Sequence, residues 1–184
     1  LNRNKWPDRV IIFFTTLFTG VPSFVLATLL LLIFCVQLQW FPVWSADSPN
    51  YFLPVVSLSL YPMAYITRLT KTSMLDALSQ DYVRTARAKG VPQVKVIFKH
   101  ALRNALIPVV TYVGPMIAGI ITGSMVVESI FTIGGLGTQF VNSINNSDYP
   151  LVMATTIFLG TLMVAANLIT DLVYKVIDPR INLE

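Results

Sequence analysis

Apolar and polar positions divide the chain into four long segments almost free of charge, separated by shorter polar stretches. A helix of about 20 apolar residues is long enough to cross a bilayer. The pattern therefore predicts an all-α, polytopic membrane protein with four spans, over residues 11–36, 48–67, 106–127 and 149–172. Trp40 and Trp44 follow the first span as aromatic residues do at a membrane interface. Pro54 and Pro62 interrupt the second span, either as a kink toward a pathway or as packing features.

Residues 128–148 carry little charge but are rich in Gly, Asn, Ser and Thr, so they are not predicted to span. Glycines at 134, 135 and 137 indicate a turn. Apolar residues at 136, 140, 141 and 144 then predict a short amphipathic helix on the surface. The glycines are not a phosphate-binding loop, because the Gly-Lys-Ser/Thr ending of that motif is missing.

Residues 68–105 form a basic loop that holds eight of the thirteen Lys and Arg residues. Ser73 and Asp76 have the spacing of a capping box, which predicts that a helix begins there. Its apolar stripe would consist of Leu75, Leu78, Tyr82 and Ala86.

A glycine corner is predicted inside this loop. Gly90 stands where a left-handed residue ends a helix, and Pro92 prevents simple continuation. A second helix is expected from Pro92 to about Ala105, with an apolar stripe of Val94, Ile97, Phe98, Ala101 and Ala105. From the local pattern alone, the loop is either a joint between two amphipathic helices or a solvated basic segment that only orients the protein.

The distribution of charge predicts the orientation. Three Lys and Arg residues precede the first span, eight lie in residues 68–105 and two lie in the tail, while the segments around Asp47 and Asp148 have none. By the positive-inside rule, both ends of the chain and the central loop are cytoplasmic.

The central loop resembles the EAA loop of binding-protein-dependent ABC importer permeases. The similarity is closest to the B-type permease subunit of the oligopeptide, dipeptide and nickel group. It is carried by Asp81-Tyr-Val-Arg-Thr-Ala-Arg-Ala-Lys-Gly90 and Leu102-Arg-Asn-Ala-Leu-Ile-Pro108. Further support comes from Glu128-Ser-Ile-Phe131, Gly135-Leu-Gly137, Asp148-Tyr-Pro-Leu151 and Asp178-Pro-Arg180. Arg84-Thr85 replaces the more general Glu-Ala, and the later proline lies farther from Gly90 than in sugar importers. Both departures are usual for the peptide group.

The resemblance implies a type I ABC importer-like permease domain that covers the whole chain. Such subunits have about six helices, two of them upstream, and the first residue, Leu1, also leads us to expect a fragment. It further implies a bacterial or archaeal plasma membrane, a second homologous permease subunit and an extracytoplasmic substrate-binding protein. Cytoplasmic ABC ATPase subunits would bind ATP and Mg. The cargo would be oligopeptides or dipeptides, or alternatively nickel or another chelated metal.

By the same resemblance, the loop would dock on the ATPase and couple ATP hydrolysis to alternating access. The residues expected to do so are Asp81, Tyr82, Arg84, Thr85, Ala86, Arg87, Lys89, Gly90 and Pro92. Glu128 is the acid nearest a membrane interior, which makes it a candidate for the substrate path or gate. It is grouped with Gly119, Gly123 and Met125; the alternative is an interfacial residue with access to water.

Catalytic chemistry is not expected in this chain. His100 is the one histidine and Cys35 the one cysteine, and neither a Ser/His/Asp set nor His-Glu-x-x-His occurs. We therefore predict no enzyme activity, metal site or cofactor here, and no nucleic-acid binding, because no such motif accompanies the basic residues. An ion-driven transporter or channel is the other class, and it would need acids well inside a span.

Overall fold

The structure is a computed structural model that describes residues 5–121 and 124–177. These residues form helices and connecting loops without a β-strand, which confirms the all-α prediction. In chain order the elements are α1 (Trp6–Gly20), α2 (Ser23–Leu30), the π-helical segment η1 (Leu31–Gln37), α3 (Phe52–Ser79), α4 (Asp81–Ala88), α5 (Gln93–Lys95), the π-helical segment η2 (Val96–Ala101), α6 (Leu102–Ile121), α7 (Met125–Ile130), α8 (Leu136–Asn145) and α9 (Tyr149–Ile177).

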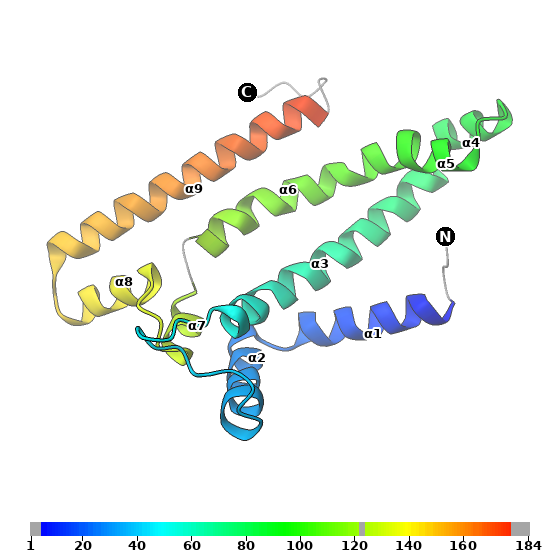
Figure 1. Ribbon diagram of the computed structural model, residues 1–184. Coiled ribbons are helices and arrows are strands. Elements are labelled where there is room, and N and C mark those ends of the chain that lie inside the picture. The colour runs from blue at the N-terminus through cyan, green and yellow to red at the C-terminus, as the bar shows by residue number, and fades with distance from the viewer. Residues whose placement is uncertain (1–4, 122–123, 178–184) are drawn as a thin grey trace.

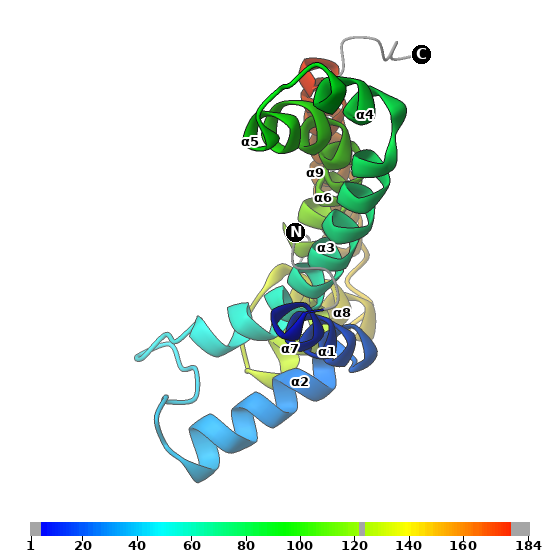
Figure 2. The ribbon, with the colours of Figure 1, turned by 90° about the vertical axis from the view of Figure 1, so that its right-hand side faces the viewer.

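Four long helices form one layer in the order α1, α3, α6, α9 (Figure 1). Helix α3 packs against α1 on one side and α6 on the other, and α9 packs against the far side of α6. Helices α4 and α5 lie at one end of this layer, whereas α7 and α8 lie at the opposite end (Figure 2). An ion pair between Asp8 and Lys71 joins the first turn of α1 to α3. The basic loop 68–105 thus ends in a helical cap at one end of the layer.

The first predicted span is not one helix. The charge-free run 11–36 is divided between α1 and α2–η1, which meet at an angle of 101°. Val21 and Pro22 have extended backbone angles at the break. A proline lacks the N–H that a continuing helix needs and pushes the preceding residue out of the helical region. The prediction of a single helix was wrong because it used the length of the uncharged run and ignored Val21-Pro22.

Membrane-crossing length is present elsewhere in the layer. Among the described residues, α3 and residues 149–173 of α9 are long and apolar enough to cross a bilayer, and the bent α1–α2–η1 pair would make a third crossing. The span predicted over 106–127 differs at both ends. Helix α6 begins earlier, at Leu102, and Ser124 starts the separate helix α7, its side chain accepting a hydrogen bond from the Val127 N–H.

The end of the layer opposite α4 has its own apolar core. It is built from the buried residues Ala27, Cys35, Leu53, Val127 and Phe131. This core holds α2 and η1 against the start of α3 and against α7. Helix α8 is present where the apolar pattern predicts a short amphipathic helix, and Gly137 and Ser143 lie on its buried side.

Candidate functional site

The candidate site is the helical corner formed by the end of α3, by α4, α5 and η2, and by the start of α6. Helix α3 runs without interruption through Ser73 and Asp76 and ends at Ser79. The helix start predicted at Ser73 is therefore wrong, because a capping-box spacing also occurs by chance inside a helix. The break comes at Gln80, which has an extended backbone and whose N–H donates to the Ala77 carbonyl. Helix α4 begins at the next residue, Asp81.

Gly90 forms the predicted left-handed corner. Its φ is +74°, and it is the glycine with positive φ among the described residues. The Gly90 N–H donates to the Arg87 carbonyl at 2.9 Å, and the Val91 N–H donates to the Ala86 carbonyl at 3.2 Å. These two bonds are the pair that defines a Schellman motif. Val91 also packs against the buried cluster that contains Ala86, and an apolar contact often accompanies this motif. The corner thus has a defined geometry set by local hydrogen bonds.

The chain after the corner leads directly into the membrane layer. Pro92 precedes α5, and the Val96 N–H donates to its carbonyl at 3.0 Å. Segments α5, η2 and α6 follow one another without a gap from Gln93 to Ile121. The boundary predicted near residue 105, between loop helix and span, is therefore absent. A movement of the corner is passed into α6 by an unbroken helical backbone.

The corner has a packed interior that ties its helices together. Six buried residues make this corner core: Ala77, Val83, Ala86, Val96, Ala101 and Ala105. Val83, Val96 and Ala101 are completely buried. This close packing joins α4 to the end of α3 and to the start of α6. Three positions of the stripe predicted after Pro92 are buried in η2 and α6, namely Ile97, Ala101 and Ala105.

Tyr82 is not in this core, contrary to the predicted stripe. The break at Gln80 changes the helical register, so α4 buries Val83 and Ala86 and leaves Tyr82 exposed. Val94 and Phe98 were likewise placed on the inner stripe, yet they are 68% and 65% exposed. The periodicity of apolar residues predicted an apolar face on each of the two loop helices, but it could not show which residues pack against the neighbouring helices.

The outer surface of the corner is basic with exposed apolar residues. Of the predicted docking residues, Ala86 is buried in the corner core. The others are exposed: Asp81, Tyr82, Arg84, Thr85, Arg87, Lys89, Gly90 and Pro92. Arg84 and Asp81 form an exposed ion pair at 3.5 Å, which contributes little to stability. Such a protruding, well-ordered surface suits binding to another protein rather than catalysis. No group of three or more metal-ligating side chains occurs in the described part of the chain.

Glu128 makes a structural contact at the opposite end of the layer. Its Oε2 accepts hydrogen bonds from the Thr138 N–H at 2.8 Å and from the Thr138 hydroxyl at 3.0 Å. The carboxylate thereby caps the first turn of α8, where the helix dipole favours negative charge. A side chain at Gly135 would begin 2.3 Å from the Glu128 carboxyl carbon, so the carboxylate would have to shift to make room for it.

The other residues of the predicted substrate path do not gather around Glu128. Gly119 is exposed on α6 and has space around it for a side chain. Met125 begins α7, and its backbone lies against Gly137. Gly123 lies outside the described residues. A role for these four residues in the path stays a prediction.

The model of the family described as "Binding-protein-dependent transport system inner membrane component" matches residues 1–183. The chain belongs to this family. The chain is similar to the dipeptide transport system permease protein DppB of Bacillus subtilis, with 47% identity over 184 residues and all of this chain. The oligopeptide transport system permease proteins OppB of Haemophilus influenzae and Salmonella typhimurium are 46% and 45% identical over 99% of it. The chain spans 60% of the length of each of these curated relatives.

Membership in this family accounts for the apolar layer as part of a membrane protein. It also confirms the resemblance to binding-protein-dependent importer permeases. What the sequence did not indicate is a group of three tyrosines on α3 and α6. No charge or motif marks them, and only the packing of the two helices brings them together.

Proposed function

We propose that this chain is part of the membrane-spanning region of a peptide importer permease, and that the corner at 81–92 docks on a cytoplasmic ATPase subunit. The relatives reported above are named for dipeptide and oligopeptide transport, which favours peptide over nickel as cargo. The permease would hydrolyse no ATP itself. A second permease chain, a pair of ATPase subunits and an extracytoplasmic binding protein would complete the transporter.

The observation that carries this proposal is the construction of the corner. Its outer surface is exposed and ordered, while its corner core joins it to both α3 and α6. A partner that grips α4 and changes shape would move the cytoplasmic ends of two neighbouring membrane helices together. Such a rigid lever is what alternating access needs, because packed helices shift as bodies rather than deforming continuously.

Cysteine crosslinking tests the docking. In the full-length subunit with Cys35 replaced by serine, cysteines at the exposed positions Arg84 and Arg87 are expected to crosslink to an ATPase subunit. The yield should change when nucleotide closes the ATPase pair. A cysteine at Val83 is the matched control, because that side chain is completely buried within the same helix and should crosslink poorly. Absence of crosslinks from both exposed positions in an intact complex would refute the docking.

The orientation of the layer is a separate prediction. Ser48 and Asn146 are exposed at the end opposite the corner, and Gln93 is exposed on the corner itself. Cysteines at Ser48 and Asn146 should react with a membrane-impermeant maleimide added to intact cells, whereas one at Gln93 should react only after the membrane is opened. Reaction of the Gln93 variant in intact cells would reverse the proposed topology.

A further inference from the structure

One face of the α3–α6 pair carries a strip of tyrosines. Tyr61 and Tyr65 are four residues apart on α3, so they lie on the same side of it, with ring centroids 6.3 Å apart. Tyr112 of α6 continues the strip, its ring centroid 4.3 Å from that of Tyr65. Tyr61 and Tyr65 are both exposed to about two-fifths of their surface, 41% and 39%. The three rings will be called the tyrosine strip.

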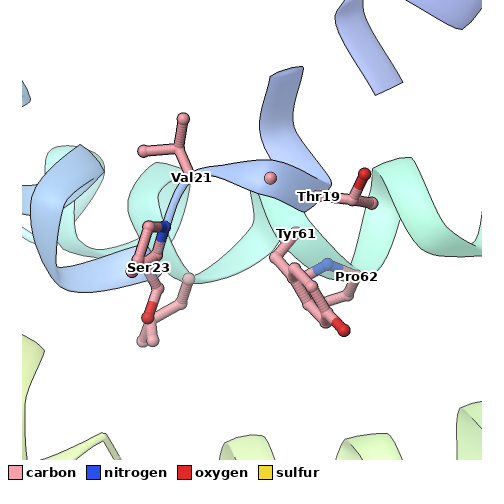
Figure 3. A pocket seen from close by; sticks show the side chains of 8 residues that line it. Thr19, Val21, Ser23, Tyr61 and Pro62 are labelled. Carbon is pink, nitrogen blue, oxygen red and sulfur yellow. The ribbon is translucent and has the colours of Figure 1, made fainter. Parts of the chain in front are cut away.

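One pocket adjoins Tyr61 of this strip, and a second lies farther along α3 and α6. The first has a volume of about 420 Å³ and lies at the break between α1 and α2, where Thr19, Ser23, Leu58, Tyr61 and Pro62 line it (Figure 3). The second has a volume of about 340 Å³ and lies toward the corner, lined among others by Ser73, Asp76, Asn104 and Pro108. Both pockets contain hydroxyl, amide or carboxylate side chains within a largely apolar lining.

Each pocket also contains a proline and the residue four positions before it. In the first pocket these are Leu58 and Pro62, both on α3; in the second they are Asn104 and Pro108, both on α6. Because proline has no N–H, it cannot make the helical hydrogen bond to the carbonyl four residues earlier. A carbonyl acceptor is thereby freed beside each pocket.

The opposite side of α3 differs in character. Met63 lies about 200° around the helix from Tyr61 and is 62% exposed. Apolar exposed residues also occur on α9, the helix at the edge of the layer, for example Ile157, Val164 and Leu168. Polar side chains and freed backbone acceptors are not stable against lipid hydrocarbon, so the tyrosine-bearing face must adjoin water or protein.

We propose that the tyrosine strip and its two pockets form a wall of the path through which a peptide passes, and that they bind its backbone. This rests on the proposed function. Tyrosine hydroxyls donate to peptide carbonyls, and the freed carbonyls at Leu58 and Asn104 accept from peptide N–H groups. The rings offer apolar area that accepts many side chains. Binding through the backbone gives a path that admits peptides of different sequence.

The test uses the full-length subunit in its assembled transporter, reconstituted in vesicles with its binding protein and a fluorescent tripeptide. Tyr65→Ala combined with Tyr112→Ala should lower uptake about tenfold, since each loses a hydrogen bond and a ring contact. Tyr65→Phe with Tyr112→Phe should give an intermediate loss. Met63→Ala, on the opposite side of the same helix, is the control and should transport normally. In all variants the ATPase activity stimulated by loaded binding protein should persist.

A photo-crosslinking residue in place of Tyr61 supplies a direct readout. During turnover it should label the tripeptide, and the same residue in place of Met63 should not. Normal uptake by the double alanine variant would overturn the inference, and so would labelling of the second permease chain in place of the tripeptide. In either case, uptake by the wild-type transporter would still support the proposed function. If the wild-type transporter moves no peptide at all, the proposed function itself fails.

Discussion

Gly90→Val is expected to reduce substrate uptake severely while the subunit still inserts and accumulates normally. Gly90 has φ +74°, and a β-carbon placed there would have no atom within 4 Å. The cost of the valine is therefore backbone strain rather than a clash, about 1–2 kcal/mol for a residue with a β-carbon and more when it is β-branched. That cost is too small to prevent apolar helices from inserting.

The strain acts on a joint that must hold one angle. Relaxing Gly90 breaks the hydrogen bonds from Gly90 and Val91 to the end of α4, and it withdraws Val91 from the corner core. Helix α4 would then no longer be fixed relative to α6. We expect ATP hydrolysis to become uncoupled from uptake or to be lost through poor docking, as measured in reconstituted vesicles with subunit amounts determined by immunoblot.

Asparagine supplies the matched control for this variant. It tolerates the left-handed conformation much better than valine, while adding a side chain of similar size to open space. Gly90→Asn should therefore retain most of the uptake that Gly90→Val loses. Equal uptake by the valine variant and the wild type, with both complexes fully assembled, would show that the corner is a passive loop.

Features set by neighbouring residues could be predicted from the sequence. The corner depends on Gly90 and Pro92, and its hydrogen bonds all lie within six residues of the chain, so the sequence alone located it. The same is true of α8, whose apolar spacing is visible in ten residues. The break at Val21-Pro22 belongs to this class as well. Pro22 indicates a break in the helix, but the prediction of one span relied on the length of the uncharged run instead.

Features that depend on packing between distant segments could not be predicted. Nothing local distinguishes Val83 from Tyr82 as the buried residue of α4, because the choice depends on where η2 and α6 lie. The contact of the Glu128 carboxylate with the start of α8 was not predicted either, because Thr138 lies ten residues farther along the chain. The tyrosine strip likewise exists only because α3 and α6 are neighbours in the layer.

Gly114 of α6 lies close against Thr170 of α9, and we expect even Gly114→Ala to weaken the membrane layer. A β-carbon at Gly114 would lie 1.8 Å from the Thr170 hydroxyl oxygen and 2.5 Å from the Thr170 β-carbon. Thr170 is buried, and its hydroxyl donates to the Ala166 carbonyl at 2.7 Å, so it has little freedom to move away. The helices must separate instead, and overpacking of this kind costs about 1–3 kcal/mol.

The identity of the clashing atoms gives this last prediction a specific rescue. Thr170→Ala should restore little, because the β-carbon of position 170 would still lie 2.5 Å from the new one. Thr170→Gly removes the β-carbon of residue 170. The double variant Gly114→Ala with Thr170→Gly should therefore recover most of the substrate uptake, and most of the complex should again survive heating in detergent. Gly160→Ala on α9, the helix that also carries Thr170, is the control, since a β-carbon at position 160 would meet nothing within 4 Å. Small residues at a helix interface matter only where the two backbones must come close together. A Gly114→Ala complex as heat-stable as the Gly160→Ala complex would therefore mean that the packing of α6 against α9 does not depend on a glycine at position 114.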